Sequence, residues 1–313
     1  MSDDIVKIIV IAGPTASGKS SLALRVAKEI DAEIISADSR QIYRQLKIGT
    51  DRLDESQMQG ITHHLMGSHD LDKRFTAFDF VDEAERAIET ARRNKKHIII
   101  CGGTGLYIRA LVDGIYELPD GDISYRNELL DLAASKGPKF IHDMLAEVDP
   151  TEASQVHYNN MIRVIRALEI YHLTGKPKSS IKALTEPRNE NFRFIQIILT
   201  PPRDPLYNRI EQRVDEMFQE GLVEEARSVY ESSFGPALKE RKIVGYSELI
   251  DYLEDEISIE EARRLIKQNT RRYAKRQYTW FRRVSNARFI DDFGADAFTE
   301  TQSVIETFLD IPA

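Results

Sequence analysis

The sequence predicts an α/β fold of the P-loop NTPase-like type, in which a mostly parallel sheet is flanked by helices and carries a helical insertion domain. Three observations predict this class. Short apolar runs alternate with helical patterns, the first apolar run leads directly into a glycine-rich phosphate-binding motif, and one central region lacks strand-like runs. Alternating strands and helices are typical of βαβ units with parallel strands.

The elements follow from the hydrophobic pattern along the chain. Strands are expected at residues 7–12, 33–37, 97–101, 192–199 and, more weakly, 288–290. Helices are expected between these strands at 19–30, 77–93 and 106–113, in the central region at 125–135, 138–147 and 161–172, and later at 205–230, 246–253 and 259–283. We therefore assign residues 1–117 and 190–313 to a P-loop catalytic core with C-terminal helices, and residues 118–189 to the helical insertion domain.

Composition narrows the class of protein. The 313 residues include 42% hydrophobic and 30% charged residues, which is ordinary for a globular protein. No apolar run approaches the roughly 18 residues that a membrane helix needs, so no membrane association is expected. The single cysteine, Cys101, excludes an internal disulfide and is typical of a cytoplasmic protein. The net charge of −8 argues against indiscriminate binding to nucleic acid.

The most specific motif is Gly13-Pro-Thr-Ala-Ser-Gly-Lys-Ser20, which matches the P-loop pattern G-x-x-x-x-G-K-S between a predicted strand and a predicted helix. Its glycines let successive backbone N–H groups point at a phosphate. The helix N-terminus and Lys19 add positive charge, and the Ser20 hydroxyl can ligate Mg²⁺. The motif predicts a polyphosphate site without identifying the polyphosphate.

Two further loops follow predicted strands. Asp38 comes after the second strand, and Gly102-Gly103-Thr104-Gly105 comes after the third. Ligands of parallel sheets bind at the carboxyl ends of the strands, so both loops are expected beside the P-loop. Asp38 is interpreted as a general base or a partner of a metal, with N-capping of a following helix as the structural alternative.

The acidic average hides a basic segment in the last predicted helix. Between Ala262 and Arg283 there is no acidic residue, whereas Tyr273, Tyr278, Trp280 and Phe281 stand among the basic ones. The basic residues are Arg263, Arg264, Lys267, Arg271, Arg272, Lys275, Arg276, Arg282 and Arg283. A helix with this composition favours contact with an anionic polymer over a purely solvated surface.

Six segments in order resemble those of the bacterial tRNA dimethylallyltransferase family. They are the P-loop, Asp38-Ser-Arg-Gln-Ile-Tyr, Gly102-Gly-Thr-Gly-Leu-Tyr, Ile210-Glu-Gln-Arg, Val244-Gly-Tyr and Thr270-Arg-Arg-Tyr-Ala-Lys-Arg-Gln-Tyr-Thr-Trp-Phe-Arg. The resemblance runs from about Ile8 to Arg282. Ser20 stands where many members have threonine, and no Cys₂His₂ extension follows Trp280, which is similar to the bacterial form.

The resemblance implies transfer of a dimethylallyl group from dimethylallyl diphosphate to N6 of adenine 37 in the tRNA anticodon loop. Asp38 would accept the amine proton with Thr104 as its partner, Lys19 and Arg213 would hold the diphosphate, and Ser20 would bind Mg²⁺. The implied diphosphate site comprises Gly13, Pro14, Thr15, Ala16, Ser17, Gly18, Lys19 and Ser20.

The acceptor adenine must leave its stack to reach such a site. The residues that the resemblance and the basic pattern assign to tRNA are Asp38, Ser39, Arg40, Gln41, Thr104, Arg126, Arg163, Arg166, Arg241, Lys242, Gly245, Tyr246, Arg271, Lys275 and Arg276. Arg126, Arg163 and Arg166 lie in the predicted insertion domain, which is therefore expected to contact tRNA. A monomer is expected.

Three other functions remain open on the sequence. An adenylate isopentenyltransferase would use free AMP or ADP as acceptor, and would not need the basic helix. A small-molecule P-loop kinase would need a nucleoside-binding segment and arginines on a lid, which we cannot place. A non-enzymatic RNA-binding protein would leave Asp38 and Thr104 without a role.

Overall fold

A computed structural model describes residues 5–114, 118–182 and 190–310. Contacts within the chain define two compact units, one formed by residues 1–112 with 189–313 and the other by residues 113–188. The first unit contains the sheet and the P-loop, and the second is helical. Both predicted domain boundaries fall at or beside segments outside the described residues.

The sheet of the first unit has six parallel strands in the order β3-β2-β4-β1-β5-β6. These are β1 (Val6–Ala12), β2 (Ala32–Ser36), β3 (His63–His64), β4 (His97–Gly102), β5 (Phe192–Leu199) and β6 (Ala287–Ile290). All five predicted strands are confirmed. Strand β3 was not predicted, because its two residues are too few to show a hydrophobic period.

Both faces of the sheet are covered, which explains why the strands read as continuous apolar runs. Ile9 and Ile11 of β1 pack with α1 (Lys19–Ile30) and α15 (Ala295–Leu309) in one hydrophobic cluster. On another side of the strands, α3 (Ala77–Arg93) contacts β2 and β4. Ile8, Ile9, Val10 and Ile11 are all fully buried, so successive side chains of β1 are shielded on alternating faces.

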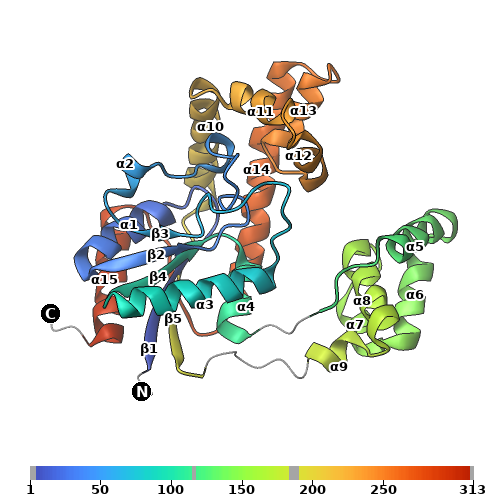
Figure 1. Cartoon of the computed structure of the whole chain (residues 1–313), viewed down its shortest axis with the longest axis horizontal. Coiled ribbons are helices and arrows are strands. Elements are labelled where there is room, and N and C mark those ends of the chain that lie inside the picture. The colour runs from blue at the N-terminus through green and yellow to red at the C-terminus, as the bar shows by residue number, and fades with distance from the viewer. Residues whose placement is uncertain (1–4, 115–117, 183–189, 311–313) are drawn as a thin grey trace. The chain divides into compact units, whose positions relative to one another are not determined.

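Helices α10 to α14 form a group of their own in the first unit (Figure 1). They are α10 (Arg203–Gln219), α11 (Leu222–Tyr230), α12 (Gly235–Arg241), α13 (Tyr246–Leu253) and α14 (Ile259–Phe281). The prediction of one helix over 205–230 was wrong, because Gly221 adopts a left-handed φ of 98° and begins a new helix. Helices α12 and α15 were not predicted.

The remaining elements of the first unit are short or lie beside the strands. They are η1 (Ile48–Thr50), α2 (Glu55–Met58) and α4 (Gly105–Asp113), of which α4 was predicted. Within the described residues, the structure contains no helix long and apolar enough to cross a membrane.

In the part of the second unit that the structure describes, five helices surround an apolar core of their own. They are α5 (Ile123–Lys136), α6 (Pro138–Val148), α7 (Pro150–Gln155), α8 (Met161–Thr174) and α9 (Lys178–Lys182). Leu129, Ile141, Leu145 and Leu168 are among the buried side chains of that core. The three helices predicted here are confirmed as α5, α6 and α8.

The topology explains where a ligand can bind. Strands β1, β2 and β4 are neighbours, and they end at Ala12, Ser36 and Gly102. Because they are parallel, the loops after them emerge at the same edge of the sheet. This edge therefore brings together the P-loop, the Asp38 loop and the Gly103–Thr104 loop.

Candidate functional site

The P-loop connects β1 to the N-terminus of α1. Gly13 has a φ of 153°, and a Cβ there would lie 2.7 Å from the backbone oxygen of Leu199, so only glycine fits. Gly18, with a φ of 87°, precedes α1, whose first turn carries no acid to offset its positive end. Among the described residues, the buried Ser17 hydroxyl and Arg213 Nε have no hydrogen-bond partner. These unsatisfied donors suit a polar anionic ligand.

Lys19 extends from this helix N-terminus, and its Nζ donates to the Pro14 carbonyl at 3.3 Å. Burial lowers the pKa of Lys19, although the neighbouring Cys101 and Asp38 act in the opposite direction. Burial also raises the pKa of the Cys101 thiol to about 11, so this thiol stays protonated near neutral pH. Lys19 also lines the larger cavity, so its ammonium is accessible to an incoming anion.

Asp38 forms the turn after β2. Its Oδ1 accepts the backbone N–H groups of Arg40 at 2.8 Å and Gln41 at 3.3 Å. Asp38 thus caps a turn, whereas the helix N-cap considered from the sequence is wrong, because the next helical element, η1, begins only at Ile48. Among the described residues, no hydrogen bond is formed by Oδ2 of Asp38, which leaves this oxygen able to accept a proton. Capping and general-base chemistry are compatible in this geometry.

Thr104 and Ser39 hold two of the strand-end loops together. The Thr104 hydroxyl accepts from Ser39 N at 2.9 Å and donates to the Ser39 hydroxyl at 3.3 Å. Thr104 N also donates to the carbonyl of Ala37 at 3.1 Å. Thr104 therefore fixes the Asp38 loop through Ser39 and Ala37.

Arg213 reaches the P-loop from α10. Its Nη1 donates to the Thr15 hydroxyl at 3.0 Å, and its Nη2 lies 3.2 Å from Asp51 Oδ2. Asp51 follows η1, and Gln41 fixes this segment by donating to the carbonyls of Thr50 and Asp51. Gln41, expected to contact tRNA, is thus engaged within the protein.

Gln277 of α14 is a site residue that was not predicted from the sequence. Its Oε1 accepts Thr15 N at 2.8 Å, and its Nε2 donates to the Gly103 carbonyl at 2.9 Å. The sequence pattern could have identified it. Gln277 lies on the same helix face as the buried Ala274, Tyr278 and Phe281, and a polar residue on a buried helix face needs hydrogen-bond partners.

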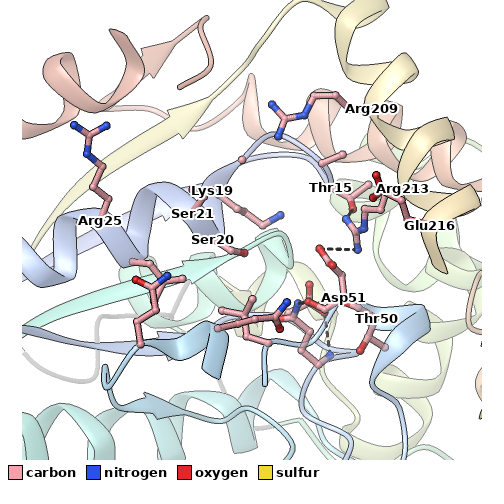
Figure 2. Close-up of a pocket in the computed structure, with 18 of the residues that line it drawn as sticks. Thr15, Lys19, Ser20, Ser21, Arg25, Thr50, Asp51, Arg209, Arg213 and Glu216 are labelled. Carbon is pink, nitrogen blue, oxygen red and sulfur yellow. Dashed lines mark hydrogen bonds and ion pairs between the residues drawn. The ribbon is translucent and has the colours of Figure 1, made fainter. Parts of the chain in front are cut away.

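A cavity of about 700 Å³ lies over the P-loop. Figure 2 shows Lys19 and Ser20 on one side of it, with Thr15, Arg213 and Asp51 converging from the other. A second cavity of about 230 Å³ lies between α10 and α14. Both cavities are lined by Thr15, Lys19, Asp38, Thr50 and Arg213.

The second cavity collects several residues that were assigned to tRNA. Arg40, Lys242, Gly245 and Arg276 line it together with Asp38. Tyr273 lines it as well, and burial raises the pKa of this phenol to about 12, so it stays a hydrogen-bond donor near neutral pH. Lys275, next to Arg276, is exposed on the same helix.

Other residues assigned to tRNA in the first unit have internal partners. Tyr246 is fully buried and donates to Glu225, so its ring is not available for stacking on a base. Arg241 donates to the carbonyls of Leu71 and Lys73. Arg271 pairs with Glu211 of α10. These three placements depart from the expectation because burial and neighbouring acceptors are set by tertiary packing.

The three arginines of the second unit that were assigned to tRNA have different surroundings. Arg126 and Arg166 both pair with Glu169, a carboxylate that is completely buried. Together they hold the pKa of Glu169 below its usual range, against the effect of its burial. Arg163 is exposed, and among the described residues its side chain forms no ion pair. Of the three, Arg163 is thus the one whose guanidinium is not committed to Glu169, although the Arg126 side chain is also 44% exposed.

Ser20 was predicted to ligate Mg²⁺. It lines the larger cavity with the carboxylates of Asp38 and Asp51, and hydroxyl and carboxylate oxygens are the donors that Mg²⁺ prefers. No group of three or more His, Cys, Asp or Glu side chains that could hold a metal by themselves occurs among the described residues. The donor set therefore fits an ion that is completed by water and ligand oxygens.

Comparisons with known proteins agree with this geometry. The sequence model of the IPP transferase family matches residues 41–284. The tRNA dimethylallyltransferase of Geobacter metallireducens is 44% identical over 285 residues, which is 91% of this chain and 92% of that protein. The tRNA dimethylallyltransferase 1 of Pelobacter propionicus is 46% identical over 275 residues, 88% of this chain and 89% of that one.

Solved structures are similar over nearly the whole chain. The tRNA isopentenylpyrophosphate transferase of Bacillus halodurans has a TM-score of 0.68 and 38% identity, and 97% of each chain is covered. A eukaryotic dimethylallyltransferase acting on tRNA has a TM-score of 0.79 and 28% identity, and the match covers 98% of this chain and 80% of that one.

Proposed function

Because this chain belongs to the IPP transferase family, we propose that it transfers a dimethylallyl group from dimethylallyl diphosphate to N6 of adenine 37 in the tRNA anticodon loop. The chain is thus an enzyme of tRNA modification. The single observation that carries the finer proposal is that Lys19, Arg213 and Asp38 line both cavities. A group that binds the leaving diphosphate and a group that accepts a proton therefore face the same space.

The diphosphate side of the reaction is assigned to the P-loop. Its N–H groups and the N-terminus of α1 would bind the diphosphate, with Lys19 and Arg213 supplying full positive charge. As the C1–O bond of the donor breaks, negative charge grows on the departing oxygen, and these groups stabilise it. Magnesium held by Ser20 and diphosphate oxygens would add further charge neutralisation.

The acceptor side is assigned to Asp38. The exocyclic amine of adenine is a weak nucleophile, and it must lose a proton as its nitrogen bonds to C1 of the donor. Oδ2 of Asp38 would take that proton, while Oδ1 keeps its two backbone N–H partners. The products are the N6-dimethylallyl adenine, diphosphate and a proton on Asp38, so the exchange of atoms and charge is balanced.

Recognition of tRNA is assigned to the rim of the smaller cavity. Arg40, Lys242 and Arg276 are cationic groups around the space that would receive a flipped adenine. Lys275 beside them and Arg163 of the second unit are exposed cations suited to phosphate contacts. The single buried cysteine supports action in a reducing compartment such as the cytoplasm, and we propose that the enzyme acts as a monomer.

An assay with labelled donor tests this proposal. The protein is incubated with Mg²⁺, labelled dimethylallyl diphosphate and either unmodified tRNA or AMP, and a separate reaction contains ATP and small-molecule acceptors. Label is expected in tRNA at adenine 37 and not in AMP. Label in AMP would support an adenylate isopentenyltransferase, and phosphoryl transfer from ATP would support a kinase; either result contradicts the proposal.

A further inference from the structure

The amide of Gln277 is bonded at both ends to loops that emerge from different strands. Its oxygen accepts the backbone N–H of Thr15 in the P-loop, and its nitrogen donates to the carbonyl of Gly103 after β4. Only 6% of the residue is exposed. Because both partners are backbone atoms, Gln277 fixes the paths of the two loops and not merely the side chains on them.

The absence of a side chain at Gly103 leaves room for this amide. A Cβ at position 103 would lie 2.3 Å from Nε2 of Gln277, closer than real contacts allow. The glycine therefore permits the hydrogen bond, and any larger residue would push the glutamine side chain away. We call the bridge from Thr15 through Gln277 to Gly103 the Gln277 clamp.

The clamp joins the two halves of the reaction site. On one side, the Thr15 hydroxyl accepts from Arg213, which is assigned to the diphosphate. On the other side, Gly103 precedes Thr104, whose hydroxyl accepts from Ser39 N beside Asp38. A displacement of either loop would change the distance between the donor carbon and the proton acceptor.

We propose that Gln277 is a positioning residue that fixes the spacing between the diphosphate cradle and the Asp38 loop. This inference rests on the proposed function and deepens it. Gln277 lines the smaller cavity, but both polar atoms of its amide are bonded to backbone groups, so its loss leaves the charged groups that bind each substrate in place. What is lost is their alignment, and misplacement of reacting groups by about 1 Å costs about 10²-fold in rate.

The test separates binding from transfer in single-turnover experiments. Gln277→Met keeps the length and bulk of the side chain and removes both hydrogen bonds. We expect the single-turnover transfer rate to fall about 10²-fold, while the Kd values for pyrophosphate and for unmodified tRNA each change less than about threefold. The matched control is Gln268→Ala on the same helix, which should leave the rate unchanged, as its side chain has no hydrogen-bond partner among the described residues.

A double-mutant cycle tests the clamp itself. Gly103→Ala should displace the Gln277 amide and slow transfer, since its Cβ would overlap Nε2. Adding Gln277→Ala to Gly103→Ala should slow transfer little further, because the same bridge can be lost only once. Independent effects that multiply would overturn the inference.

Stability measurements separate a loss of alignment from a loss of folded protein. The rate is normalised to the folded fraction, and the melting temperature of each variant is recorded. A normalised rate within threefold of wild type for Gln277→Met would overturn the positioning role, as would equal weakening of substrate binding and transfer. If the wild-type protein itself transfers no dimethylallyl group to tRNA, the proposed function fails, and this result is distinct from a failure of the Gln277 inference.

Discussion

The Asp51 carboxylate lies 3.2 Å from the guanidinium of Arg213, in the cavity that faces the P-loop. A negative group thus pairs with an arginine that we assign to the diphosphate. The pair is partly exposed, since 57% of the Asp51 side chain is accessible, so its strength is limited by solvent. When no metal ion is bound, we therefore expect Asp51 to compete with an anionic ligand for Arg213.

In the absence of Mg²⁺, replacing Asp51 with asparagine should strengthen pyrophosphate binding by about two- to fivefold, as expected for loss of a competing surface ion pair. Isothermal titration calorimetry at fixed ionic strength measures the change. Glu29→Gln, an exposed position on α1, controls for the altered net charge. Weaker binding in Asp51→Asn without Mg²⁺ would contradict this competition and show that Asp51 supports the anion site directly.

Asp38→Asn should lower kcat by about 10² or more, because an amide cannot accept the amine proton. The asparagine oxygen can still accept the N–H groups of Arg40 and Gln41, so the turn should remain intact. Transfer is measured with labelled donor, and tRNA affinity is measured by filter binding. Parallel losses of transfer and of tRNA affinity would make Asp38 a structural cap only.

Pyrophosphate affinity should fall as pH rises, and it should begin to fall below the pH at which an ordinary lysine loses its proton. Burial lowers the pKa of Lys19 in the ligand-free protein, so its positive charge is lost earlier. The bound anion favours the charged form, and binding at alkaline pH should be accompanied by proton uptake.

Lys19→Arg provides the comparison for this pH dependence. Arginine stays protonated, so the fall should move to higher pH in the variant even if its overall affinity is lower. Titrations over a pH series with both proteins cancel the ionisation of pyrophosphate itself. Identical pH profiles for the two proteins would show that Lys19 does not contact the anion.

Removing Lys275 and Arg276 together should weaken tRNA binding and flatten its salt dependence, by about one unit of slope per lost phosphate contact. Among the described residues, neither side chain pairs with a carboxylate. Arg264→Ala is the control, since this arginine on the same helix is paired with Glu261. Equal salt slopes in the double variant and in wild type would place the tRNA elsewhere.

Tyr246→Phe should lower the free energy of unfolding by about 1–2 kcal/mol with tRNA affinity nearly unchanged. The variant removes the hydroxyl that donates to Glu225, a carboxylate that also accepts the N–H groups of Lys47, Ile48 and Gly49. Denaturant unfolding measures the loss, with Tyr252→Phe of the same helix as control. Unchanged stability together with weakened tRNA binding would restore Tyr246 as an RNA contact.

The sequence predicted the strands and the longer helices because their residues carry strong local periodicity. The limits of α1 and α3 agree with prediction, since each helix has its own apolar face. The break at Gly221 was missed because one glycine within a helical pattern does not reveal its φ angle. Helix α15 was not predicted, although buried residues such as Phe298 and Ile305 give its sequence a helical hydrophobic spacing.

By itself, the sequence determined the parallel α/β fold and the P-loop, because strand alternation and a contiguous motif are properties of neighbouring residues. Ordered motifs also established the resemblance to tRNA dimethylallyltransferases. Only the tertiary structure decided which charged and polar groups are free. Arg126, Arg241 and Tyr246 are occupied by partners distant in sequence, whereas Gln277 joins two loops that lie 174 and 262 residues away. Such pairings depend on the packing of whole elements, which no local pattern encodes.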